Sequence, residues 1–347
     1  MAATTIANLF PPSVWVEALV ERMATYPSLI NRGAIMRDER LDAAASGPGT
    51  SANIPFFKDS TDTADEIQVE GTGPTINNVT TGTQIAPVLN RVSTFGAQAL
   101  SGAVSGTDPL QHAIDQIVSR RMKQRQTTML SILDGIFSEG TASTAMLACS
   151  NASFEEAIAS QDSGDLIDSD FISDTLALMG ENQDLLQNGF IAMHPQIHAN
   201  LKKQDKTNFD RDSSLGFMVN FYQGIPVILS SSLRRAGTTD GYVYSTYFVS
   251  EGAFAGGDKA QVSGTEDEIA GTPESVASIT KKGDAHVNSC TFYDRTRFLL
   301  QPFGVAFTIG SISGQSATNA ELEDKTDWSL VASSADRVGI AAAFTNG

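Results

Sequence analysis

The sequence is poor in cysteine and in basic residues, and each shortage excludes a class of protein. Only two cysteines occur among 347 residues, at Cys149 and Cys290. Two thiols cannot make a disulfide framework, so a disulfide-stabilised scaffold is excluded and a reducing compartment is favoured. The 23 Lys and Arg residues face 40 Asp and Glu residues, which gives a formal net charge of −17. A chain this acidic repels phosphate backbones, which argues against a protein that reads DNA or RNA sequence.

Long apolar runs are also missing. A membrane-spanning helix needs about 18 or more consecutive apolar residues, and even the apolar tail Val338–Phe344 is far shorter. The first basic residue is Arg22, so the charged start of a secretory signal is absent. We therefore expect a soluble, acidic globular protein of two or three domains that has no membrane partner.

The motifs of common enzyme classes are absent as well. The chain has no phosphate-binding loop, no nucleophile elbow and no complete dinucleotide fingerprint. His194 and His198 stand four residues apart, a spacing that could present two imidazoles to a metal on one helix face. Pro195 lies between them and no third ligand is identifiable, so we expect one capping and one surface histidine. The sequence predicts no catalytic residue, no metal and no cofactor.

Two further candidates for chemistry have ordinary structural explanations. The acidic run Asp162–Asp170 lacks the ligand spacing of a calcium loop, and we expect a solvated loop in which Ser169 or Asp170 caps the next helix. Cys149 has no histidine nearby in the sequence, so we expect a structural free thiol.

The strongest helical signal runs from Asp108 to Ile136. Asp108 is a favourable N-cap, Pro109 suits the first helical position, and apolar residues then recur at steps of three and four. This predicts a spine helix about 40 Å long. It carries four of the 23 cations within six residues: Arg120, Arg121, Lys123 and Arg125.

Two interpretations of these four cations remain open. They could pair with residues 138–189, which hold ten acidic side chains and no Lys or Arg. They could instead contact another chain or enclosed nucleic acid. Helical geometry places Arg121 and Arg125 on one face and Lys123 almost opposite them.

The stretch Leu41–Thr83 is rich in Gly, Thr, Ser, Asp and Asn, with apolar residues only in the short patches Asn53–Phe57 and Ile67–Val69. Such a composition cannot build a core of its own, which predicts a protruding loop or β-hairpin that needs a partner surface. Its return limb, Thr83–Phe95, has the composition of a strand, and Pro87 favours an edge position.

The rest of the chain predicts a mixed α+β architecture with strands in scattered order. Helices are expected at Val14–Thr25 and at Asp170–Leu186, and a loop is expected at Ala255–Gly283. Core strands are expected at Gly224–Ser230 and Gly241–Val249. A strand, turn and short helix fit Phe190–Asp205, and two long strands broken near Gln301 fit His286–Gly310.

Several segments, in order along the chain, resemble the major capsid proteins of tailed bacteriophages with the HK97-like fold. The helix "SGTDPLQHAIDQIVSRRMKQRQTTMLSILDGIF" is similar to that family's G-S-D-P…L-x-G-[VI]-F segment. One departure is Gln301, where family members often have a histidine before the proline. The other matching segments are Ile30–Asp42, Ile54–Asp59, Ile191–Asp205, "YQGIPVILS", "YSTYFVSEGAF", "RTRFLLQPFGVAF" and Asn319–Val331.

The resemblance implies an organisation and a function. It implies an N-terminal arm at residues 1–40 and an extended β-hairpin E-loop at 41–95. It also implies a P domain at 96–139 and 286–311, with the spine helix and long strands, and an A domain at 140–285 and 312–347. Such a protein self-assembles as hexamers and pentamers into the icosahedral shell that encloses phage double-stranded DNA. It is not an enzyme, and it resides in the virion capsid after assembly in the host bacterial cytoplasm.

The resemblance also implies partners. Because the chain starts at Met1 directly with the arm, we expect a separate scaffolding protein, besides a portal, a decoration protein where one is present, and packaged DNA contacted non-specifically. Subunit-interface or lumen-facing positions are expected at Phe56, Phe57, Lys58, Arg120, Arg121, Lys123 and Arg125. Two alternatives stay open: an encapsulin-type compartment shell with the same fold, and a metalloenzyme that depends on His194 and His198.

Overall fold

The computed structural model describes a large part of the chain. The described residues are 35–37, 39–47, 49–58, 66–67, 73, 76, 78–98, 117–137, 146–204, 209–212, 219–237, 239–258, 277–284 and 287–346. The helix expected at Val14–Thr25 and the expected helix start at Asp108 lie outside them. None of the described helices combines the length and the hydropathy that crossing a bilayer requires.

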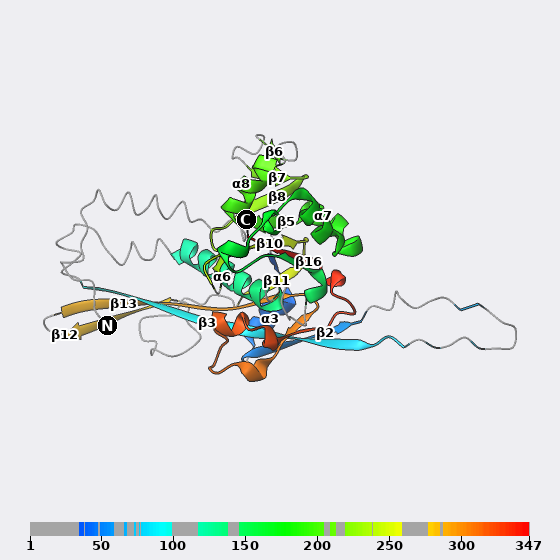
Figure 1. Cartoon of the computed structure of the whole chain (residues 1–347). Helices are drawn as coiled ribbons and strands as arrows, with labels where there is room; N and C mark the ends of the chain where they lie inside the picture. Colours follow the sequence, from blue (N-terminus) through cyan, green and yellow to red (C-terminus); the bar gives the residue numbers. More distant parts are fainter. Residues whose placement is uncertain are drawn as a thin grey trace.

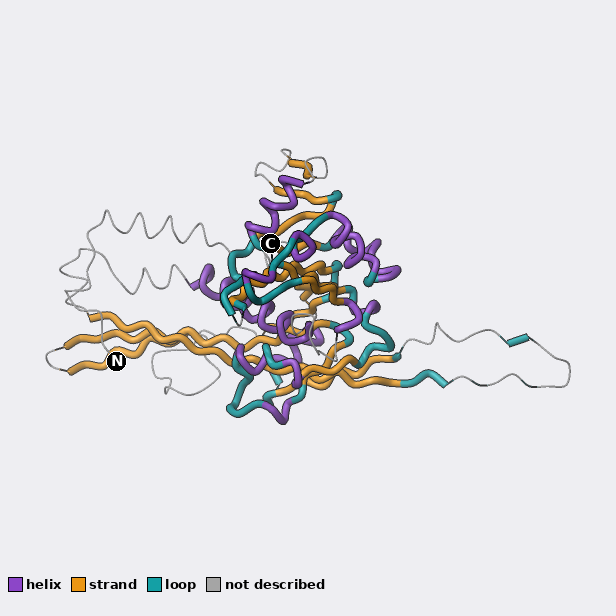
Figure 2. Tube along the Cα trace, viewed as in Figure 1, coloured by secondary structure: helices purple, strands orange, loops and turns teal. Residues whose placement is uncertain are grey.

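A long, narrow sheet forms the base of the molecule (Figure 1; Figure 2). Its described strands follow the order β1-β11-β13-β3-β2, and β12 also pairs with β13. β1 is parallel to β11, and the other pairs are antiparallel. The strands are β1 (Ile35–Arg37), β2 (Ser51–Phe57), β3 (Thr81–Gln98), β11 (Phe254–Asp258), β12 (Ala277–Asp284) and β13 (Val287–Pro302).

Strand β3 changes its neighbour at Pro87. Residues 81–87 pair with β2, and residues 88–98 pair with β13. Pro87 has Ser51 as its partner and no partner in the described part of β13. Proline has no N–H to donate to a ladder, so it is tolerated where a strand is paired on one side only. The edge position expected for Pro87 is confirmed at this point.

A second, mixed sheet forms the body above the long sheet (Figure 1). Its described strands follow the order β4-β16-β10-β5-β8-β7-β6, and β9 pairs with β10. The strands are β4 (Ser150–Ser153), β5 (Phe190–Met193), β6 (Phe209–Asp212), β7 (Val219–Tyr222), β8 (Ile225–Leu229), β9 (Arg234–Ala236), β10 (Tyr242–Val249) and β16 (Ile340–Thr345). A small pair joins β14 (Val305–Phe307) to β15 (Trp328–Leu330).

The described helices are short except for one. They are α3 (Glu39–Ser46), α6 (Ile117–Phe137), α7 (Ser169–Ala177), α8 (Pro195–Gln204) and α9 (Asn319–Leu322). Single 3-10 segments are η3 (Leu147–Cys149), η4 (Ile158–Ser160), η5 (Ser163–Asp165), η6 (Gly180–Asn188), η7 (Ile309–Ser311), η8 (Lys325–Asp327) and η9 (Asp336–Val338). The expected α+β class is confirmed.

Helix α6 is the described part of the expected spine helix, and it anchors the main core. Its C-terminal half buries five large side chains completely: Met129, Ile132, Leu133, Ile136 and Phe137. Their spacing of three and four residues is the helical period that the sequence shows. They join the core that also contains β5, β10 and β16. The helix therefore connects the body to the C-terminal segment.

A second, smaller core corrects the expectation for Leu41–Thr83. Leu41 and Ala45, one helical turn apart on α3, are buried with Ala52 of β2 and Ala86 of β3. Helix α3 lies so close to β11 that a Cβ on Gly257 would come within 2.3 Å of the Leu41 backbone. The first part of this stretch thus has a core within its own chain. Most residues of this smaller core are alanines, whose small side chains do not mark a sequence segment as apolar.

Other expected elements are shorter than the sequence indicates. The helix expected over Asp170–Leu186 ends at Ala177, and Gly180 takes a φ of +55° that interrupts the α-helix before η6. The loop expected at Ala255–Gly283 begins in β11 and ends in β12. The second of the two long strands is only β14, because the chain turns at Gly304 (φ +81°) and β14 pairs with β15.

Candidate functional site

The hairpin of β2 and β3 presents exposed apolar side chains at its outer end. Phe57 is 76% exposed, and in the loop beyond it Ile67 and Ile76 are 90% and 85% exposed. The Lys58 N–H donates to the Thr80 carbonyl oxygen at 2.8 Å and closes the described ladder. We call residues 58–80 the hairpin loop. Its described apolar residues join neither of the two cores that the described residues form.

Phe56 differs from its neighbour Phe57. It faces Gly82 across the strand pair, and a Cβ on Gly82 would lie 2.6 Å from its ring. Phe56 is half-buried, whereas Phe57 and Lys58 are exposed. The structure thus separates three residues that the sequence groups together, and Phe57 is the aromatic side chain that remains exposed.

A basic groove of about 380 Å³ lies between α6, β3, β13 and α9. It contains three cations and no carboxylate among its lining residues. From here on the basic groove means Arg91, Arg120, Lys123, Gln124, Thr127, Thr128, Phe298 and Asn319. Arg120 and Lys123 are the two members of the predicted cation cluster that the structure brings into it.

Arg91 is fixed in place on β3. Its guanidinium donates to the Ala317 carbonyl oxygen at 2.6 Å and to Ser316 Oγ at 3.2 Å. Burial lowers the Arg91 pKa, and the nearby Glu321 carboxylate opposes that shift. The sequence analysis missed this arginine because β3 and the 316–319 segment are more than two hundred residues apart.

Two members of the cation cluster, Arg120 and Arg125, contact the long sheet. Arg120 donates to Ser93 Oγ of β3. The guanidinium of Arg125 lies 5.3 Å from the centroid of the Phe298 ring on β13, a cation–π geometry. Lys123 is exposed, while Arg121 and Arg125 are half-buried, as the helical phasing predicts.

The two spaced histidines belong to the start of α8. His194 Nδ1 accepts a hydrogen bond from the Gln196 N–H at 3.1 Å, so the expected capping histidine is confirmed. His198 is buried beside Ile197 and Leu201, so the expected surface position is wrong. Burial, with the Lys202 charge, lowers its pKa to about 4. The described residues hold no group of three or more His, Cys, Asp and Glu side chains suited to a metal ion.

Acidification from pH 6.5 to about 4 is expected to destabilise the fold through His198. In this window the unfolded chain binds a proton at the imidazole and the folded chain does not, so the free energy of unfolding falls as the pH falls. Urea denaturation of the wild type and of His198→Gln should show curves that diverge across this window and run parallel above about pH 7. Parallel curves throughout would show that His198 does not carry this linkage.

The remaining candidates have structural roles. Cys149 is buried, its Sγ donates to the Leu178 carbonyl oxygen at 3.5 Å, and burial raises its pKa to about 11, which confirms a structural thiol. In the acidic run, Asp162 and Asp165 form a reciprocal capping box on η5. The cap of α7 is Asp168, whose carboxylate accepts from the Phe171 N–H at 2.7 Å, and not Ser169 or Asp170 as expected.

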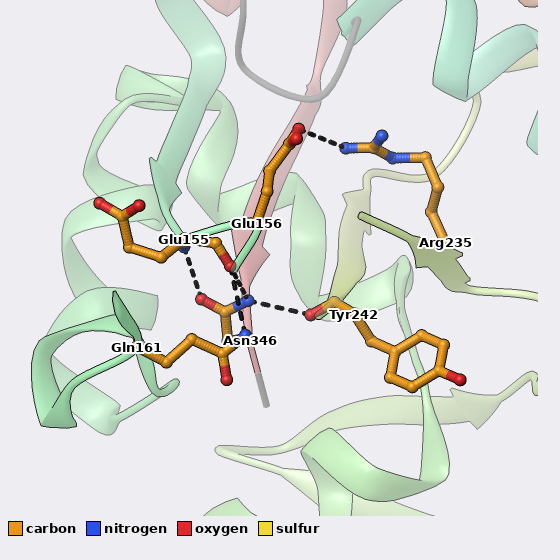
Figure 3. Close-up of polar contacts among 6 residues, drawn as sticks. All are labelled: Glu155, Glu156, Gln161, Arg235, Tyr242 and Asn346. Carbon is orange, nitrogen blue, oxygen red and sulfur yellow. Dashed lines mark hydrogen bonds and ion pairs between the residues drawn. The ribbon is translucent and has the colours of Figure 1, made fainter. Parts of the chain in front are cut away.

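Asn346, directly after β16, forms hydrogen bonds with two neighbouring segments of the chain (Figure 3). Its side-chain amide donates to the carbonyl oxygens of Glu155 and Tyr242, both at 2.9 Å. Its side-chain oxygen accepts from the Glu155 N–H at 2.7 Å. Beside it, Glu156 and Arg235 form an ion pair at 3.9 Å. These contacts hold β16 in place between β4 and β10.

Comparison with known proteins links this architecture to viral shells. No family model matches the chain. The chain is 23% identical over 334 residues to the major capsid protein of Bacillus phage SPP1, and the match covers 95% of each chain.

Two solved structures are similar in fold. The capsid of cyanophage Pam1 has a TM-score of 0.54 at 10% identity, covering 88% of this chain and 87% of that one. The capsid of Ralstonia phage GP4 has a TM-score of 0.53 at 10% identity, covering 93% and 90%. The HK97-like capsid fold expected from the resemblance is therefore confirmed.

Proposed function

We propose that this chain is the major capsid protein of a tailed bacteriophage and self-assembles as hexamers and pentamers into the icosahedral shell around double-stranded DNA. One observation carries the proposal: the end-to-end match to a phage major capsid protein, over 95% of both chains. The capsid fold of the two similar structures supports it. The role is structural, and the chain resides in the virion capsid.

The domain organisation is part of the proposal. The arm comprises residues 1–40, the E-loop 41–95, the P domain 96–139 and 286–311, and the A domain 140–285 and 312–347. Helix α6 and strand β13 support the P domain, and residues 96–98 of β3 pair with β13 within its bounds, whereas residues 88–95 of the E-loop continue the same ladder. The eight-stranded sheet supports a separate A domain.

The proposed interface residues form two groups, one at the end of the hairpin and one on α6. Phe57 and Lys58 stand at the outer end of the hairpin, where a neighbouring subunit can bury them, and Phe56 supports them from within. Arg120, Arg121, Lys123 and Arg125 lie on α6 as a second contact surface. Burial of one exposed phenylalanine contributes about 1.5–3 kcal/mol, repeated at every subunit.

The remaining partners follow from assembly as a phage shell. A separate scaffolding protein, a portal and, where present, a decoration protein would act with this chain, and assembly would take place in the host bacterial cytoplasm. The net charge of −17 disfavours tight adhesion of packaged DNA to the shell, so contacts with DNA would be few and non-specific.

The alternatives differ in what their particles contain. An encapsulin-type shell would enclose a cargo protein, whereas a phage shell encloses nuclease-protected DNA. The metalloenzyme alternative gains no support, because His194 Nδ1 already accepts from a backbone N–H and His198 is buried.

Sedimentation of the purified chain tests the proposal. Wild-type protein, alone or with its scaffolding protein, should convert from slowly sedimenting subunits or capsomers into one fast particle class that appears hollow and closed by negative stain. A chain that stays monomeric under all such conditions would contradict a shell function.

A further inference from the structure

We propose that the basic groove beside α6 is a binding site for a phosphate group, either as the free ion or as a phosphodiester of nucleic acid. The inference goes beyond the proposed shell function, because binding to the single subunit is enough to test it. The evidence is the convergence of three cations on one concavity, the unusual hydrogen bonding of one of them, and the arrangement of donors around the groove.

The cations reach the groove from two elements. Arg120 and Lys123 are three residues apart on α6 and therefore lie on the same face of the helix. Arg91 enters from β3, which runs beneath that helix in Figure 1. The Arg120 guanidinium donates to Ser93 Oγ on the same strand, and this contact holds it beside the groove. Among the described residues that line the groove there is no carboxylate, so the groove attracts anions.

Arg91 carries its charge into a half-buried position and donates no hydrogen bond to a carboxylate. Its guanidinium donates to neutral oxygens, which belong to Asn90, Ser316, Ala317 and Asn319. Burial lowers the Arg91 pKa, so the loss of water around this charge outweighs the attraction of Glu321. Burial of a charge costs free energy unless an opposite charge compensates it. An anion in the groove would supply that compensation.

Glu321 is the carboxylate that acts on Arg91, and its oxygens accept hydrogen bonds from other donors. One oxygen accepts from the hydroxyl and the N–H of Ser313, at 2.6 and 2.9 Å. The other accepts from the N–H and the hydroxyl of Thr318, at 2.8 and 3.1 Å. These hydrogen bonds, that of the Ser313 hydroxyl first, lower the Glu321 pKa to about 2. The carboxylate is therefore held by the 313–318 segment and leaves the groove open to an anion from outside the chain.

The arrangement of the lining favours phosphate over a planar carboxylate. The polar side chains come from three elements: Arg91 from β3, Asn319 from α9 and the two cations of α6. A phosphate group has oxygens that point in several directions, and it binds arginine through two parallel hydrogen bonds and lysine as a point charge. The groove volume of about 380 Å³ lies within the roughly 300–1,000 Å³ of small-molecule sites, so a phosphate group fits.

Calorimetric titration of the full-length subunit with inorganic phosphate tests the inference. Sodium chloride keeps the ionic strength constant, because salt screens charge interactions. Wild type should bind one phosphate per chain. Lys123→Gln should weaken binding about tenfold and Arg120→Gln/Lys123→Gln about a hundredfold, since each substitution removes a charged donor. Circular dichroism verifies that each variant is folded.

Lys203→Gln is the matched control. Lys203, like Lys123, is an exposed lysine on a helix, and it lies on α8 outside the groove. The substitution makes the same charge change as Lys123→Gln, so it reports the effect of net charge alone. Its affinity for phosphate should stay within about twofold of wild type.

A second titration identifies the source of the phosphate group. The probe is a short single-stranded oligothymidylate, which carries phosphodiesters. If nucleic acid is the source, the oligonucleotide should compete with inorganic phosphate, and its affinity should fall in Arg120→Gln/Lys123→Gln but not in Lys203→Gln. An oligonucleotide affinity that is the same in all three proteins, with phosphate binding lost only from the groove variant, assigns the site to the free ion.

Three results would overturn the inference. The first is a folded wild type that binds no phosphate, and the second is equal phosphate affinity in Lys123→Gln and Lys203→Gln. The third is a short polyglutamate peptide that displaces phosphate and binds the groove more tightly than the oligonucleotide and the free ion, which would make it a carboxylate site. Failure of the wild type to form shells would contradict only the proposed function, because these titrations are made on the subunit.

Discussion

Removal of residues 59–79, with Lys58 joined to Thr80 through a short Gly-Ser turn, is expected to abolish shell assembly and to leave the subunit folded. Lys58 and Thr80 are already joined by a backbone hydrogen bond of 2.8 Å, so a tight turn can replace the loop. Ile67, Ile76 and Val79 are strongly exposed, and their loss should change the free energy of unfolding by less than about 0.5 kcal/mol. Sedimentation measures assembly and thermal denaturation measures folding.

A variant with residues 59–79 replaced by Gly and Ser at the same length is the matched control. It should also fail to assemble, because it keeps the reach of the loop and loses its charges and apolar side chains. Normal shells from either variant would show that the hairpin loop is dispensable. The deletion must stay within these bounds, since Ala45 and Ala52 belong to the second core and a cut beginning near residue 45 would damage the fold.

Gly135→Ala is expected to cost about 3 kcal/mol of stability or more, the upper part of the range for overpacking. A Cβ at this position would lie 2.1 Å from the Leu322 carbonyl oxygen and 2.6 Å from Trp328 Nε1. The same two groups form a hydrogen bond of 2.8 Å with each other, so neither can move away from the added methyl group without disturbing that bond. In a helix without this close contact, replacing glycine with alanine normally raises stability by about 1 kcal/mol. The predicted loss of stability therefore has the opposite sign to the usual effect of this substitution.

Gly310→Ala is the matched control, because a Cβ there meets no atom within 4 Å. Its urea midpoint should stay near that of the wild type, whereas that of Gly135→Ala should fall sharply. Equal midpoints for the two variants would mean that α6 does not pack against Leu322 and Trp328 as described.

Periodicity and turn chemistry predicted much of the fold. Apolar residues at helical spacing identified α6, and short runs of apolar residues identified β5, β8, β10 and part of β13. What the sequence did not reveal depends on tertiary contacts. Helix α3 is stabilised by the packing of Leu41 and Ala45 against β11 and β13. Most of the residues in this core are alanines, so the sequence has no clear apolar pattern there. The end of α7 depends on one glycine in the left-handed conformation.

The sequence predicted only some of the residues that line the basic groove. Arg120 and Lys123 stood out because cations cluster on one predicted helix. Arg91 and Phe298 complete the groove from β3 and β13, and nothing local marks them. Likewise His198 was placed at the surface because the spacing of two histidines does not reveal which face of α8 packs inward. Residues contributed by distant strands need the fold before they can be assigned.

A cryo-electron microscopy reconstruction of the assembled particles tests the central claim most directly. The account predicts a closed icosahedral shell of pentamers and hexamers in which the β2–β3 hairpin of each subunit crosses onto its neighbour. A shell in which each hairpin folds back on its own subunit, or particles without icosahedral closure, would contradict it.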